Sequence, residues 1–123
     1  MVRKVRQVRW VGPALRELRA LPEAVRVVAG FALYQAQQGD KHVDAKPLKG
    51  FPGASVLEVV VNERGDTYRV VYTTGFCGVI YVLCAFQKKA PRRRKTPDRR
   101  VELIRSRLKT AEEHYRLDPV RRR

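Results

Sequence analysis

Three β-branched segments follow one another at short intervals in this 123-residue chain, and they limit the folds that it can adopt. The segments VLEVVVN (56–62), TYRVVYTT (67–74) and VIYVLCAF (79–86) are rich in residues that favour strands. The turn ERGD joins the first two, and a loop with Gly75 and Gly78 joins the second and third. Because such short connections join antiparallel neighbours, we predict an antiparallel meander.

Helical patterns lie on both sides of this meander. Residues 13–21 and 22–39 each begin with a proline, a residue favoured at helix starts, and Gly39 supplies a stop for the second helix. Near the C-terminus, Thr96 is a good N-cap, followed by Pro97 and Asp98 in the first turn. An apolar stripe then follows at spacings of three and four: Val101, Ile104, Leu108, Ala111 and Tyr115.

The remaining segments complete the predicted order of elements. VRQVRWV (5–11) alternates as a strand does, and residues 40–55, with two prolines and two glycines, indicate a loop. The expected order is β-α-α-β-β-β-α, which is an α+β fold with helices against a small antiparallel sheet. We expect one domain over residues 1–117 and a basic tail over 118–123.

Charge is the most unusual bulk property of the chain. It has 27 Lys and Arg against 12 Asp and Glu, a net charge of +15 and a pI near 10.7. Such an excess favours a polyanionic partner, and nucleic acid is the commonest one. An anionic membrane is disfavoured, because the main basic block lacks the bulky apolar anchors of a membrane-surface helix.

The N-terminus and the cysteines point to the cytoplasm. The first ten residues mix charged and apolar positions and lack the apolar core of a signal peptide, and no apolar run approaches the length that spans a bilayer. Cys77 and Cys84 are too few for a disulfide framework or a zinc site. We therefore expect a cytoplasmic protein with two reduced cysteines.

The main basic block starts where the third strand of the meander ends. Between Lys88 and Arg100, eight of thirteen residues are Lys or Arg, and Asp98 is the one acid. The arginines and lysine at 92–95 are typical of a solvated loop. Lys88 and Lys89 differ, because the strand end holds their backbone, and we expect one of them to share a surface with Arg69.

Arg69 is a charged residue in the middle of an apolar strand, where it is costly unless it is paired or faces an open surface. Strand alternation places it on one face with Val71, and Tyr68 and Tyr72 on the other. Two interpretations stay open. Arg69 forms an ion pair with Glu58 on the neighbouring strand, or it faces a concave surface and contacts a phosphate.

Conventional catalytic motifs are absent from the sequence. His42 and His114 lie in no triad-like pattern, no glycine-rich loop has phosphate-binding spacing, and no acidic cluster suits a metal. We therefore expect no metal and no cofactor. Clustered cations still suit RNA cleavage by the 2′-hydroxyl, which needs a base, an acid and positive charge near the phosphoryl oxygens.

The joint pattern LKGF, LE, RGDTYRVVY, AFQKK, TP and RL over about residues 44–115 resembles the RelE/HigB toxins of bacterial type II toxin–antitoxin systems. It is most similar to the phage-derived HigB-like branch. The resemblance implies a microbial ribonuclease fold whose members commonly cut mRNA in the ribosomal A site. It also implies neutralisation by an antitoxin, usually a helix-turn-helix protein of the HigA type.

Residue roles follow from this resemblance by motif. Arg69 matches the strand arginine that contacts the scissile phosphate, and Lys89 or Lys88 matches a basic residue after the last long strand. RelE has two catalytic lysines on the strand matching residues 57–61, where this chain has Glu58 and Val60, so Glu58 either acts as a base or pairs with Arg69. The expected contacts to RNA or the ribosome are Arg64, Arg92, Arg93, Arg94 and Lys95.

The leading functional hypothesis is a metal-independent, ribosome-dependent mRNA endoribonuclease that inhibits translation as the toxin of a toxin–antitoxin system. Its high charge would then serve docking to ribosomal RNA. Two alternatives stay open. One is a non-catalytic RNA- or DNA-binding module on the same fold, and the other is a gyrase-targeting toxin of the ParE type.

Overall fold

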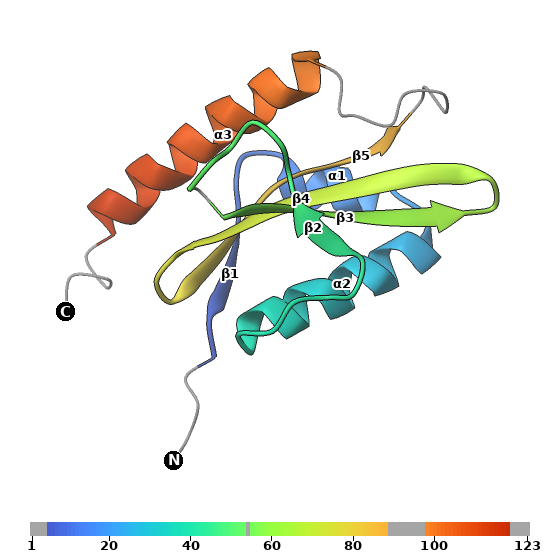
Figure 1. Cartoon of the computed structure of the whole chain (residues 1–123), viewed down its shortest axis with the longest axis horizontal. Coiled ribbons are helices and arrows are strands. Elements are labelled where there is room, and N and C mark those ends of the chain that lie inside the picture. The colour runs from blue at the N-terminus through green and yellow to red at the C-terminus, as the bar shows by residue number, and fades with distance from the viewer. Residues whose placement is uncertain (1–4, 54, 89–97, 119–123) are drawn as a thin grey trace.

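The computed structural model describes residues 5–53, 55–88 and 98–118. Within these ranges the elements follow the order β-α-α-β-β-β-β-α (Figure 1). Their bounds are β1 Gln7–Trp10, α1 Ala14–Arg19, α2 Glu23–Gln37, β2 Ala45–Pro47, β3 Val56–Glu63, β4 Asp66–Phe76, β5 Val79–Lys88 and α3 Asp98–Leu117. The predicted α+β class and antiparallel meander are confirmed. The predicted cap Thr96 and Pro97 lie outside the described residues.

The described strands form one sheet in the order β1-β5-β4-β3-β2. It differs from the prediction in two ways: β1 pairs in parallel with β5, so the sheet is mixed, and β2 lies within the predicted loop 40–55. Alternation of side chains indicates a strand but not whether it runs parallel or antiparallel to its neighbour. Because two helices follow β1, the connection is long enough for either direction, and tertiary packing decides between them. Pro47 is compatible with β2 because an edge strand does not need every backbone donor.

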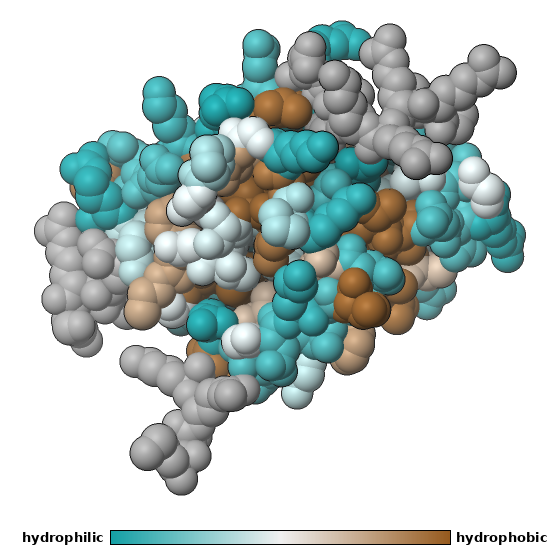
Figure 2. Space-filling model, in the orientation of Figure 1, coloured by the Kyte–Doolittle hydropathy of each residue, from teal (hydrophilic) through white to brown (hydrophobic). Residues whose placement is uncertain are grey.

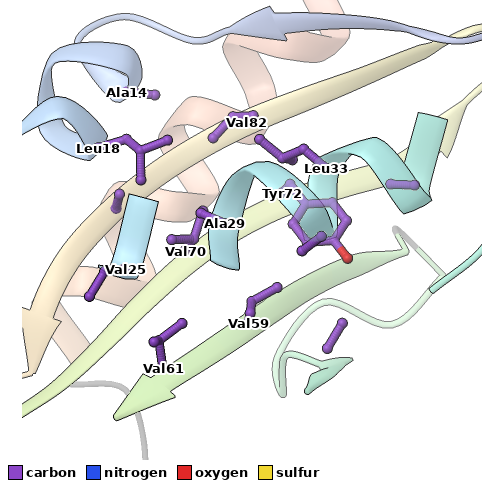
Figure 3. Close-up of a cluster of buried hydrophobic side chains, with 14 of the residues drawn as sticks. Ala14, Leu18, Val25, Ala29, Leu33, Val59, Val61, Val70, Tyr72 and Val82 are labelled. Carbon is purple, nitrogen blue, oxygen red and sulfur yellow. The ribbon is translucent and has the colours of Figure 1, made fainter. Parts of the chain in front are cut away.

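Helices cover both faces of the sheet, with α3 on one side and the α1–α2 pair on the other (Figure 1). All residues of β5 from Val79 to Phe86 are therefore buried, as in a strand covered on both faces. Figure 3 shows the α1–α2 core, where Val25, Ala29 and Leu33 of α2 lie over the sheet residues Val70 and Tyr72.

The predicted stripe of α3 packs on the opposite face. Ile104, Leu108 and Ala111 are buried there together with sheet residues of β4 and β5. In β5, Val82 faces Tyr72 and Cys84 faces Val71, so one extra residue, Leu83, bulges between them. The bulge turns both Leu83 and Cys84 toward α3.

None of the helices in the described part of the chain has the length and apolar character needed to cross a bilayer.

Candidate functional site

A buried ion pair lies on the α3 side of the sheet. Arg69 of β4 pairs in register with Val60 of β3, and Glu58 lies two residues before Val60 on the same face. The Arg69 guanidinium donates from its Nη1 atom to Glu58 Oε2 over 2.8 Å. Both residues are only 4% exposed, so this charged pair lies among apolar strands.

The first of the two interpretations of Arg69, an ion pair with Glu58, is confirmed. Arg69 is held by Glu58 across the β3–β4 ladder, as the short ERGD turn allows. That turn has positive φ at Arg64 (49°) and Gly65 (84°), the backbone of a two-residue hairpin turn, and it sets the strand register. A phosphate contact of Arg69 stays a prediction.

A lysine that the sequence analysis did not single out extends the pair toward solvent. Lys46 of β2 stands opposite Glu58 in the β2–β3 ladder, with its Nζ 3.9 Å from Glu58 Oε1. Its side chain is 60% exposed, so it is the accessible cation beside a buried carboxylate. The sequence feature that contains Lys46 is the segment KPLKGF, which was predicted to be a loop.

On the other side of Arg69, β5 contributes Phe86, its direct partner in the β4–β5 ladder. The Arg100 guanidinium of α3 lies over the Phe86 ring, 4.2 Å from its centroid, which is cation–π contact. Lys88 pairs with Thr67, two residues from Phe86, so alternation places it on the same face. Lys88, one of the two lysines expected to share a surface with Arg69, therefore lies on the same face of the sheet as Arg69, and its part in a site stays a prediction.

Arg64, the one predicted RNA contact among the described residues, does not join this cluster. Arg64 stands at the tip of the β3–β4 turn with its side chain 92% exposed, and its ion-pair partner is Glu63, 3.7 Å away. The rest of the predicted RNA or ribosome contacts, together with Lys89, lie outside the described residues: Arg92, Arg93, Arg94 and Lys95.

Comparison with known proteins identifies the family of this chain. The model of the phage-derived Gp49-like protein family (DUF891) matches residues 16–109, which is most of the sequence. This protein belongs to the phage-derived Gp49-like family. That family is toxin-like and of the RelE/ParE type, so the chain is a toxin-like module. A search of curated proteins gives no match.

A second ion pair lies within the residues matched by the Gp49-like model. Arg107 of α3 donates from Nη1 and Nη2 to the two carboxylate oxygens of Glu17 in α1, both over 2.7 Å. Arg107 also donates to the Leu83 carbonyl over 2.8 Å, and the Ala85 N–H donates to Glu17 over 3.3 Å. The sequence analysis missed this pair, because its members lie 90 residues apart.

The charge of Arg107 is well stabilised in this Gp49-like protein. Its hydrogen bonds to Glu17 raise the pKa of the guanidinium above its ordinary value, while burial acts in the opposite direction. Between the two pairs lies Cys84, whose pKa is raised to about 12, first by burial and then by the charge of Glu17. Cys84 is therefore a neutral core thiol and not a nucleophile.

Proposed function

We propose that this protein is the toxin of a HigB-like toxin–antitoxin system and cleaves mRNA on the ribosome without a metal. The site would be the Glu58–Arg69 pair with Lys46, Lys88 and Arg100 around it. Its partner in the cytoplasm would be an antitoxin with a helix-turn-helix domain of the HigA type. Membership of a toxin-like family supports the class, and the basic cluster supports an RNA substrate.

The observation that carries the proposal is the buried pair itself. Taking two charges out of water costs several kcal/mol per ion, and apolar residues of similar volume often stabilise a protein as well or better. Both ladders beside Arg69 are in regular register at that point, so the strands there already pair with one another. A costly and buried pair of charged groups is a typical mark of a functional site.

The pair and its neighbours offer the groups that transesterification of RNA requires. Glu58 would take the proton of the 2′-hydroxyl, whose oxygen then forms a bond to phosphorus while the bond from phosphorus to the 5′-oxygen breaks. Lys88 or Lys89 would give a proton to the departing 5′-oxygen. Arg69 would stabilise the phosphoryl oxygens, since a guanidinium can hold a carboxylate and a phosphate on different edges. Arg64 and the basic residues at 92–95 would contact ribosomal RNA.

The enclosure of the pair favours a second candidate function. At 4% exposure, Arg69 and Glu58 offer little surface to a substrate, whereas Lys46 and Arg64 are open to solvent. A module that binds RNA through its exposed cations would leave the buried pair unused. This non-catalytic reading predicts translation inhibition without cleavage.

The two candidates are separated by primer extension on a defined mRNA in a bacterial translation extract. The wild type is compared with Glu58→Gln, Arg69→Lys and Lys88→Gln. These changes keep a polar side chain of similar size and remove the carboxylate, the guanidinium and the ammonium group, respectively. Lys109→Gln on the exposed surface of α3 is the matched control for Lys88→Gln. Each site variant is expected to lose cleavage by about 100-fold or more.

Each outcome has a defined meaning. Cuts at codon boundaries that disappear in the site variants and remain in Lys109→Gln support the nuclease. An intact message with translation blocked supports the binding module and rejects the nuclease. An intact message with normal translation rejects both, and supercoiling by DNA gyrase then becomes the next assay.

A further inference from the structure

Helix α2 is apolar on two opposite faces. Its inner face is buried against the sheet through Val25, Ala29, Ala32, Leu33 and Ala36. Its outer face also carries large apolar side chains at positions i, i+4 and i+7: Val27 is 64% exposed, Phe31 54% and Tyr34 57%. A helix with apolar residues on both sides is typical of one that is covered on both sides.

Half of the large apolar side chains that are exposed in the described part of the chain lie on this face. Figure 2 shows apolar atoms among hydrophilic ones over the position that α2 occupies in Figure 1. Gly30 lies beside Phe31 at the centre of the stripe, and a Cβ added there would meet nothing within 4 Å. The outer face therefore combines a large side chain, Phe31, with a glycine that a second helix could approach closely.

The charged residues near this face indicate which kind of partner binds it. In a chain of net charge +15, an acidic partner would choose a strongly basic surface, but the charged residues at the ends of α2 balance one another. Glu23 and Arg26 lie in the first turn, and Asp40 and Lys41 follow the last turn. These four residues form no ion pair with any other described residue.

We propose that α2 is the interface of a homodimer, in which the outer faces of two α2 helices pack antiparallel around a two-fold axis near Gly30 and Phe31. Phe31 of each copy packs on the other copy's Gly30, and Val27 meets Tyr34. The interface is then self-complementary, as a two-fold interface must be. Dimerisation through α2 would occur whether or not the protein cleaves RNA.

The antiparallel arrangement also matches the charges. The Asp40 N–H donates to the Gln35 carbonyl over 2.8 Å, which folds Asp40 back to the last turn of α2. The first turn of one helix then lies against the last turn of the other, with Arg26 near the second copy's Asp40 and Glu23 near its Lys41. Near-neutral faces also let two highly charged copies approach, since charges beyond about 10 Å are screened by salt.

Sedimentation equilibrium of the full chain tests the dimer. The wild type is expected at twice its 14.2 kDa monomer mass. Phe31→Glu should raise the dimer dissociation constant by about 100-fold or more, because it removes a central aromatic anchor. The matched control is Leu117→Glu on α3, whose side chain is similarly exposed at 56% and should leave the mass unchanged.

A charge swap tests the orientation of the helices. Arg26→Asp and Asp40→Arg should each weaken the dimer, and the double variant should restore it, because both partners of the pair occur in each copy. A wild type that is monomeric at its highest soluble concentration overturns the proposal. So does a dimer that survives Phe31→Glu or dissociates with Leu117→Glu. Far-ultraviolet circular dichroism confirms that each variant is folded.

Discussion

Two arginine–glutamate pairs lie near β5, one on the α3 face of the sheet and one at the sheet edge, and their surroundings differ. Arg107 and Glu17 join α3 to α1 beside β5, where β1 pairs only with residues 79–82. Beyond that point the Leu83 carbonyl and the Ala85 N–H lack a strand partner on that edge, and Arg107 and Glu17 bind them. The side chains of Arg107 and Glu17 thus provide the hydrogen-bond partners that a longer β1 would have provided.

The Arg69–Glu58 pair has different surroundings. Its hydrogen bond is almost as short, 2.8 Å against 2.7 Å, but it lies inside a ladder whose strands already pair. Arg107 and Glu17 also bind backbone groups of β5 at the sheet edge, whereas the Arg69–Glu58 hydrogen bond joins two side chains. The backbone groups around each pair, and not the length of its hydrogen bonds, distinguish the two.

The largest effect should come from breaking the buried pair on one side. Arg69→Ala leaves the buried Glu58 carboxylate with the exposed Lys46, 3.9 Å away, as its remaining ion-pair partner, and should lower the free energy of unfolding by about 3–5 kcal/mol. Urea unfolding followed by circular dichroism measures it. Replacing both partners, with Glu58→Leu and Arg69→Met, should cost at most about 1 kcal/mol. A double variant as unstable as Arg69→Ala would show that the pair has a structural role after all.

The same double replacement should cost more at the other pair. With Glu17→Leu and Arg107→Met, the Leu83 carbonyl and the Ala85 N–H lose their partners at buried positions. The free energy of unfolding should fall by about 2–4 kcal/mol, since each unsatisfied buried polar group costs about 1–3 kcal/mol. Urea unfolding under the same conditions provides the measurement. Equal costs for the two double variants would contradict the difference between the pairs.

Between pH 9.0 and 10.0, the smallest of these effects should be a loss of stability that reports on the buried core. Burial raises the pKa of Cys84 from 9.0 to about 12 and that of Tyr72 from 10.0 to about 12. Both groups stay neutral in the fold but ionise when unfolded, so their contribution is complete below pH 9 and is lost as pH rises toward 12.

The free energy of unfolding should therefore fall by up to about 1.4 kcal/mol per pH unit above pH 9.0 for Cys84, and by a similar further amount above pH 10.0 for Tyr72. Urea unfolding at a series of alkaline pH values measures this slope, and Cys84→Ala should reduce it. The matched control is Cys77→Ala, because Cys77 is exposed. A slope that Cys84→Ala leaves unchanged would place the titrating group elsewhere.

Much of the candidate site was predictable because its central pair is local. The turn ERGD holds two residues at its tip, so it sets which residues of β3 and β4 face one another, and alternation then assigns Glu58 and Arg69 to one face. The sequence also predicted that Lys88 or Lys89 would share their surface, and the register places Lys88 on the same face. Lys46 was missed because a three-residue strand with a proline carries almost no strand signal of its own.

The sequence by itself determined the elements of short range: the meander, its register, the face on which Arg69 lies, and the stripe that α3 buries. These follow from turn length and side-chain periodicity, which act between near neighbours in the chain. Only the tertiary structure decided that β1 runs parallel to β5, that Arg100 covers Phe86, and that Arg107 reaches Glu17. It also left Val27, Phe31 and Tyr34 outside the core, because the sheet can cover only one face of a helix.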